Sequence, residues 1–134
     1  MAFSTLVSVP EPARHLDDPS WVVIDCRFDL GRPQAGCQAY LAGHIPGAFN
    51  RPFTDNLDGE GCLHPVGALA REFRVLLGGR DPGHVIHMCG SGVTACHNLL
   101  AMDAAGLAGA KLYAGSWSEW IRDSSTPVVR GCAP

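Results

Sequence analysis

The chain has 134 residues, a length that predicts one domain spanning residues 1–134. Apolar residues make up 46% and charged residues 17% of the sequence, which excludes a disordered chain. The net charge is −3, and the one lysine and nine arginines form no basic stripe, so no nucleic-acid partner is expected.

Strand and helix patterns alternate over the first half of the chain. Trp21–Asp25 is a run of β-branched and aromatic residues, typical of a buried parallel strand. Proline and two glycines break any regular element over Gly43–Ala48, so we expect a loop there. The His44 ring is expected to hydrogen-bond neighbouring backbone and fix this loop, and the alternative is a role as general acid or base. The other elements expected here are a strand over Thr5–Val9, a brief helix to Leu16, a turn over Asp17–Ser20, a helix over Gln34–Leu41 and a surface loop over Asp55–Cys62.

The second half carries clearer patterns. Apolar residues recur every three or four positions after Pro65, and Gly78 should end that amphipathic helix. Val93–Ala105 has one formal charge, Asp103, which predicts a largely buried helix. The remaining elements expected are strands over Val85–Met88 and Lys111–Tyr113 and a short helix over Trp117–Ile121 capped by Ser116. This alternation predicts a parallel α/β sheet with helices on both faces, where ligands bind at the strand-to-helix ends.

The most informative segment joins the strand ending at Met88 to the next helix. Its members are Cys89, Gly90, Ser91, Gly92, Val93, Thr94 and Ala95. A cysteine at this place faces the unpaired N–H groups of a helix start, and the two glycines allow successive N–H groups to turn inward. Such a setting lowers a thiol pKa and stabilises a thiolate or a persulfide. No loop side chain is charged, so the donors would be the backbone, Ser91 and Thr94. The competing interpretation is that Cys89 is a small buried apolar residue.

Three further motifs accompany this loop. They are Asp25-Cys26-Arg27, Gly43-His44-Ile45-Pro46-Gly47-Ala48 and Tyr113-Ala114-Gly115-Ser116-Trp117-Ser118-Glu119-Trp120. With Cys-Gly-Ser-Gly-Val-Thr-Ala, they resemble the rhodanese sulfurtransferases, most closely the 3-mercaptopyruvate sulfurtransferase version. The resemblance implies a rhodanese-like fold with a five-stranded parallel sheet. It also implies covalent catalysis, in which Cys89 takes a sulfane sulfur from 3-mercaptopyruvate or thiosulfate and passes it to cyanide, a small thiol or thioredoxin. No metal or organic cofactor is implied.

A mercaptopyruvate donor carries a carboxylate, which a guanidinium binds through two hydrogen bonds. The resemblance makes Arg27 the best candidate anchor and Arg32 the second, although the spacing of Arg32 departs from the family pattern by one residue. The alternative for Arg27 is a structural ion pair with a buried carboxylate. The loop also lacks the basic residues typical of thiosulfate-preferring members. Members with this loop usually have two tandem domains, so a lone domain would leave its site open or cover it in a homodimer.

A metal site is one alternative reading of the histidines and cysteines. The residues concerned are His84, His87, Cys89, Cys96 and His97. Neighbouring helical residues diverge by about 100°, and the Cys-x-x-Cys spacing of zinc sites is missing, so no metal is expected. Cys96 is instead expected in the core, and His97 as a hydrogen-bonded, buried or half-buried side chain.

Two other function classes share this kind of fold. Cysteine phosphatases need an arginine six residues after the cysteine, but Ala95 occupies that position and no arginine lies between Arg80 and Arg122. A non-catalytic rhodanese module that binds a partner or senses redox state is the remaining alternative. Inactive copies usually lose the cysteine, which favours the enzyme here.

Cysteine usage suggests the compartment. Six cysteines without Cys-x-x-Cys spacing, and a start without an export-signal pattern, predict reduced thiols and a cytoplasmic location. Cys26 lies near the expected site by analogy with the fold and could serve as a resolving thiol. Glycine and proline interrupt the long uncharged runs, so no membrane span is expected.

Overall fold

The structure is a computed structural model, and it describes residues 5–28 and 35–133. Its centre is a five-stranded sheet in which every pair of neighbouring strands is parallel. The strands are β1 (Leu6–Val7), β2 (Val22–Asp25), β3 (Phe49–Asn50), β4 (Val85–Met88) and β5 (Lys111–Tyr113), in the order β1-β5-β4-β2-β3. The predicted α/β class and the five parallel strands are confirmed.

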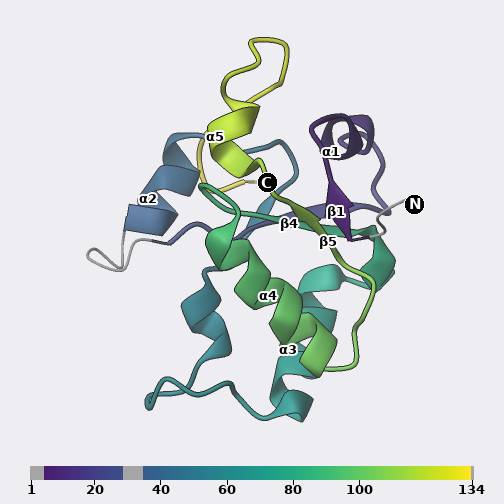
Figure 1. Ribbon diagram of the computed structural model, residues 1–134, viewed down its shortest axis with the longest axis vertical. Coiled ribbons are helices and arrows are strands. Elements are labelled where there is room, and N and C mark those ends of the chain that lie inside the picture. Colours follow the sequence, from purple (N-terminus) through teal and green to yellow (C-terminus); the bar gives the residue numbers. More distant parts are fainter. Residues whose placement is uncertain (1–4, 29–34, 134) are drawn as a thin grey trace.

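Helices cover both faces of this sheet (Figure 1). One face carries α3 (Val66–Leu77) and α4 (Val93–Ala104), which pack on each other below the strands in Figure 1. The other face carries the shorter helices α1 (Pro10–Arg14), α2 (Ala35–Ala42) and α5 (Ser116–Trp120). Two 3-10 turns complete the structure, η1 (Phe53–Asn56) and η2 (Pro82–His84). None of the helices in the described ranges is long and apolar enough to cross a membrane.

Alternating side chains of the central strands build the two cores. Val22 and Ile24 of β2 point into the cluster beneath α3 and α4, whereas Val23 points into the opposite cluster. All four residues of β2 and all four of β4 are buried. Since burial of a Val or Ile side chain contributes about 2 kcal/mol, burial of these side chains stabilises the centre of the sheet. Cys89 follows directly after the end of β4.

The helix that follows Cys89, α4, differs from the prediction. Only one side of α4 packs on the sheet and α3, and its outer side leaves Val93 and Leu100 exposed. The prediction that this helix is largely buried is therefore wrong for its outer side. Cys96 lies there too and is exposed, so its expected place in the core is also wrong. By contrast, α3 ends at Gly78 in the left-handed conformation, with φ of 58°, as the sequence predicts.

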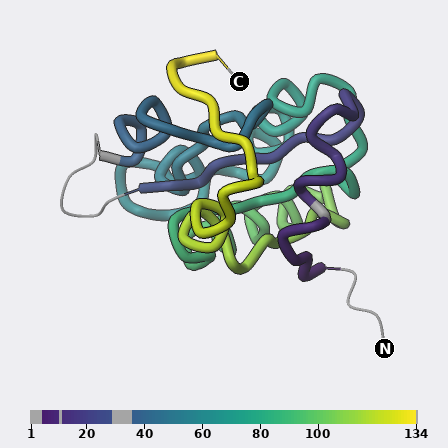
Figure 2. Tube along the Cα trace, turned by 90° about the horizontal axis from the view of Figure 1, so that it is seen from above, coloured from purple at the N-terminus to yellow at the C-terminus, as the bar shows by residue number. Residues whose placement is uncertain are grey.

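The C-terminal segment packs against the loop that contains His44. It runs in yellow across Figure 2 and ends far from the described N-terminal segment. Backbone hydrogen bonds join His44 and Val129 in both directions, at 2.9 and 3.0 Å. The His44 ring lies 2.9 Å from the Tyr40 carbonyl oxygen and 3.0 Å from that of Ala133. The predicted role of His44, fixing its loop through backbone contacts, is confirmed.

Candidate active site

Cys89 lies between the end of β4 and the start of α4, with its side chain only 2% exposed. The backbone N–H of Gly92 donates a hydrogen bond to its Sγ, with 2.9 Å between nitrogen and sulfur. Gly92 precedes the first helical residue and adopts a φ of 92°. The loop therefore turns back on itself and presents donors to the sulfur, as the pattern of glycines predicts.

Two opposing effects act on the pKa of Cys89. Burial raises the pKa. Hydrogen bonds from the Thr94 hydroxyl and from the N–H groups of Ala95, Ser91 and Gly92 together lower it by more than burial raises it. The net result is a pKa below the ordinary value of a cysteine. Because these donors are a hydroxyl and backbone amides, the hydrogen bonds that favour the thiolate come from uncharged groups.

The Thr94 hydroxyl has two acceptors within reach. It donates to the Cys26 carbonyl oxygen at 3.0 Å, and it also contributes to the lowered pKa of Cys89. A hydroxyl has one hydrogen to donate, so the two acceptors compete for it. Ionisation of Cys89 strengthens the sulfur as an acceptor and should draw the hydroxyl to it.

Gly92 cannot be replaced without moving the backbone. A Cβ at this position would lie 2.5 Å from the Ala114 carbonyl oxygen, in addition to the strain of a positive φ. Gly90 differs, since no described atom lies within 4 Å of the corresponding Cβ position. The active loop, defined here as residues 89–95, therefore makes its tight approach to the β5–α5 turn at Gly92 and not at Gly90.

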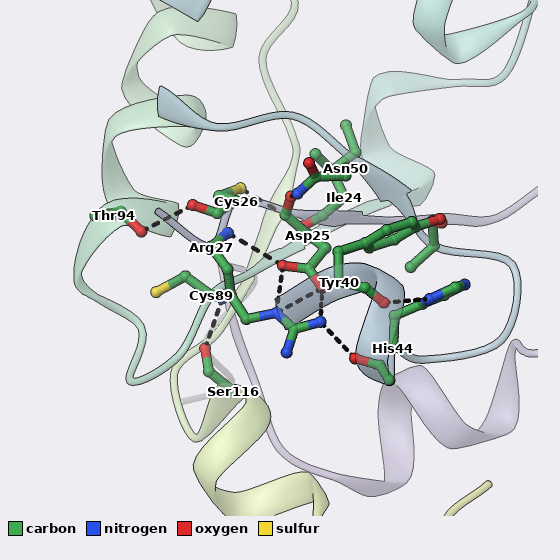
Figure 3. Close-up of polar contacts among 12 residues, drawn as sticks. Ile24, Asp25, Cys26, Arg27, Tyr40, His44, Asn50, Cys89, Thr94 and Ser116 are labelled. Carbon is green, nitrogen blue, oxygen red and sulfur yellow. Dashed lines mark hydrogen bonds and ion pairs between the residues drawn. The ribbon is translucent and has the colours of Figure 1, made fainter. Parts of the chain in front are cut away.

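The first three residues of α5 hold the active loop by three hydrogen bonds. The Trp117 N–H donates to the Cys89 carbonyl at 2.9 Å, and the Ser118 N–H donates to the Gly90 carbonyl at 3.0 Å. The Cys89 N–H donates to Ser116 Oγ at 3.0 Å (Figure 3). The predicted capping role of Ser116 is wrong, because its hydroxyl makes no bond to the helix and donates instead to the Tyr113 carbonyl.

Arg27 lies beside this loop in a buried ion pair. Its Nη2 is 2.8 Å from Asp25 Oδ2 and 2.6 Å from the Gly43 carbonyl oxygen, and its Nε contacts both carboxylate oxygens (Figure 3). The guanidinium carbon lies 4.5 Å from the centre of the Trp117 ring. The structural ion pair that the sequence left open for Arg27 is thus present. Arg32 lies outside the described residues.

A family model described as "Rhodanese-like domain" matches residues 8–123. The chain belongs to the rhodanese family. This match covers every motif on which the resemblance rested, from the end of β2 to α5.

The rhodanese domain has close curated relatives. It is 53% identical over 91 residues to the Pseudomonas aeruginosa protein named "Probable 3-mercaptopyruvate sulfurtransferase", which covers 68% of this chain and 32% of that one. It is 42% identical over 103 residues to the 3-mercaptopyruvate sulfurtransferase of Escherichia coli K12, which covers 75% of this chain and 34% of that one. The chain thus spans about a third of the length of these relatives.

A solved structure has the same fold at low sequence identity. It is the anaerobic ergothioneine biosynthesis enzyme from Chlorobium limicola in complex with trimethyl histidine, with a TM-score of 0.74 and 19% identity. The match covers 96% of this rhodanese domain and 32% of that chain. It supports the fold described above.

The other thiols and histidines of the rhodanese domain have different surroundings. Cys26 is fully buried, its Sγ accepts a hydrogen bond from Asn98 Nδ2 at 2.9 Å, and burial together with the nearby Asp25 raises its pKa. Such a thiol is a poor nucleophile, so the geometry does not support a resolving role. His97 is half-buried, with Nδ1 3.3 Å from Asn56 Nδ2, which confirms its expected environment.

The surroundings of the site offer neither a metal centre nor a cavity that contains Cys89 among the described residues. The described residues include no group of three or more His, Cys, Asp or Glu side chains that could hold a metal ion. A cavity of about 620 Å³ is lined by Leu99, Leu100 and Leu107 of the α4 side, and Cys89 is not part of its lining.

Proposed function

We propose that this rhodanese domain is a sulfurtransferase in which Cys89 carries a sulfane sulfur as a persulfide. The observation that carries the proposal is the hydrogen bond of 2.9 Å from the Gly92 N–H to Cys89 Sγ, in a loop that lowers the pKa of this thiol. A thiolate at neutral pH is the nucleophile that sulfur transfer needs. The same N–H groups suit the terminal sulfur of a persulfide, which is also an anion.

The first half-reaction loads the sulfur. The Cys89 thiolate attacks the sulfur of 3-mercaptopyruvate, an S–S bond forms and the C–S bond breaks. The electron pair of the C–S bond leaves with the carbon as the enolate of pyruvate, which then takes a proton from water. With thiosulfate, the S–S bond of the donor breaks instead and the pair leaves with sulfite. In the second half-reaction, cyanide or a thiol attacks the outer sulfur and releases the Cys89 thiolate.

The relatives and Arg27 support 3-mercaptopyruvate as the proposed donor. The two relatives described above carry the name 3-mercaptopyruvate sulfurtransferase, which favours that donor. The Nε and Nη2 atoms of Arg27 donate hydrogen bonds to Asp25 and Gly43. Its Nη1 has no hydrogen-bond partner among the residues drawn in Figure 3. We propose Nη1 as the contact for the donor's carboxylate, with Arg32 as a second anchor. An Arg27→Lys variant should raise KM for mercaptopyruvate, and an unchanged KM would remove this anchor.

We also propose an acceptor and an assembly for this domain. The acceptor is a small thiol, cyanide or thioredoxin, since each offers a nucleophile for the outer sulfur. Because Cys89 is only 2% exposed, the acceptor must reach the sulfur from the side where Gly90 and Ser91 are exposed. A homodimer is one way to cover that side.

Mass spectrometry of the loaded protein tests the proposal. The chain is incubated with 3-mercaptopyruvate or with thiosulfate, freed of donor, and examined for sulfur added to the Cys89 peptide. We expect one added sulfur atom in the natural chain and none in Cys89→Ser. Cys96→Ser is the matched control, since Cys96 is an exposed thiol on α4 outside the active loop. No adduct with either donor would contradict the proposal and favour a non-catalytic binding or redox-sensing module.

A further inference from the structure

Ser116 has an unusual backbone for its residue type. Its φ is 54°, and no other non-glycine residue in the described ranges has a positive φ. Its side chain is also fully buried. Residues with a Cβ are uncommon in this region, and when one is held there the surrounding structure must compensate. Ser116 lies directly against the active loop, and its contacts there compensate for the strained backbone.

The hydroxyl of Ser116 connects the end of β5 with Cys89. It donates to the Tyr113 carbonyl oxygen at 2.8 Å and accepts the N–H of Cys89 at 3.0 Å (Figure 3). Its single hydrogen is committed to Tyr113, so its lone pairs face Cys89. The hydroxyl is therefore oriented as an acceptor for the backbone of the nucleophile.

The positive φ of Ser116 has a second effect on the same residue. Gly115 is right-handed, with φ of −63° and ψ of −34°, and Ser116 is left-handed. Such a pair makes successive N–H groups converge into a nest for an anionic or partly negative atom. Here the Trp117 N–H donates at 2.9 Å to the Cys89 carbonyl oxygen. Of the N–H groups in this turn, that of Trp117 thus binds a carbonyl of the active loop.

We infer that Ser116 is a positioning residue for Cys89: its hydroxyl and its left-handed backbone fix the N–H and the carbonyl of Cys89, and so aim the sulfur at the donors of the loop. Both backbone polar groups of Cys89 are bound within residues 116–117. The inference rests on the proposed role of Cys89 as the reactive thiol.

Two substitutions separate the hydroxyl from the backbone. Ser116→Gly removes the hydroxyl and suits a positive φ, so the nest is kept without strain. Ser116→Ala removes the hydroxyl and keeps the Cβ and its strain. Ser124→Gly, at an exposed serine beyond α5, is the matched control for a serine-to-glycine change. Each variant is measured for unfolding by urea, for kcat and KM of sulfur transfer, and for the pH at which Cys89 alkylation is half-maximal.

We expect both Ser116 variants to lose about tenfold in kcat, because each leaves the buried Cys89 N–H without its acceptor. KM should change little. The half-maximal pH of Cys89 alkylation should rise in both variants, while Ser116→Gly stays at least as resistant to urea as Ser116→Ala. Ser124→Gly should match the natural chain in all three measurements.

Two results would overturn the inference. One is a Ser116→Gly variant with the kcat and the alkylation profile of the natural chain. The other is a loss of activity that follows the loss of folded protein in both variants, which would assign Ser116 a structural role only. Alkylation needs no sulfur donor, so it is informative even if the natural chain forms no persulfide. In that case a raised alkylation pH in Ser116→Gly would support the positioning role while the proposed sulfur transfer fails.

Discussion

Asp25 and Arg27 form an ion pair that is almost completely buried, with Oδ2 of the carboxylate 2.8 Å from Nη2 of the guanidinium. Two further contacts from Nε, at 3.0 and 2.9 Å, make the pairing bidentate. The pair lies where β2 ends, and the guanidinium also stacks over Trp117. It therefore joins the sheet to α5 next to the active loop.

Breaking this pair from the carboxylate side should destabilise the fold. An Asp25→Asn variant leaves the Arg27 charge buried without its partner, which costs about 3–5 kcal/mol in other proteins. Urea denaturation of the variant and of the natural chain measures the change in the free energy of unfolding. The double variant Asp25→Asn with Arg27→Met should recover part of the loss. A loss below about 1 kcal/mol in Asp25→Asn would show that the pair contributes little.

The sequence pattern predicted those elements whose bounds are set by neighbouring residues. It failed for elements that depend on contacts with distant parts of the chain. The strands Val85–Met88 and Lys111–Tyr113 have the predicted bounds, because each is a short apolar run between turn residues. β3 has two residues and carries no period that a sequence could show. Apolar residues lie on both the buried and the exposed sides of α4, so its pattern could not tell which side packs on the sheet.

The same division applies to the site. The environment of Cys89 was predictable, since a strand, two glycines and a helix start are neighbours in sequence. The contact of Ser116 with Cys89 spans 27 residues, and local pattern suggested a helix cap instead. For Arg27, the sequence offered both an ion pair and a substrate anchor. The structure shows the ion pair, and the anchor stays a prediction.

Gly92 should tolerate no side chain. Gly92→Ala places a Cβ 2.5 Å from the Ala114 carbonyl oxygen at a φ of 92°. Gly47→Ala is the matched control, because Gly47 has a φ of 81° and no described atom within 4 Å of its Cβ position. Strain alone should cost Gly47→Ala about 1–2 kcal/mol of unfolding free energy. Gly92→Ala should lose clearly more and form no persulfide, and equal losses in the two variants would contradict the close approach.

The Thr94 hydroxyl should contribute directly to the low pKa of Cys89. Thr94→Val keeps the shape of the side chain and removes the donor, so the pKa of Cys89 should rise. Loss of one such hydrogen bond to an anion corresponds to about a tenfold decrease in the rate of Cys89 alkylation. Thr94→Ser retains the hydroxyl and should stay near the natural chain. If Thr94→Val and Thr94→Ser alkylate with the same pH dependence, the backbone alone stabilises the thiolate.

His87 should make the fold sensitive to acid. Burial, and the nearby Arg51, lower the pKa of His87 to about 3. In the unfolded chain His87 binds a proton near pH 6.5, whereas in the folded chain it stays neutral until about pH 3. The stability that depends on a neutral His87 is therefore complete above pH 6.5 and is lost as the pH falls toward 3. Between pH 7 and 5 this group should remove about 2 kcal/mol of unfolding free energy. His87→Gln should reduce that dependence in urea denaturation at the two pH values, and an unchanged dependence would exclude His87 as its source.

The ionisation of Cys89 tests the account most directly. The rate of iodoacetamide alkylation, followed by mass spectrometry on the Cys89 peptide across a pH series, reports the fraction of thiolate. The hydrogen bonds from Gly92 and its neighbours predict a half-maximal rate clearly below pH 8.5, about the value of an unperturbed cysteine. A half-maximal rate at or above that pH would contradict the account.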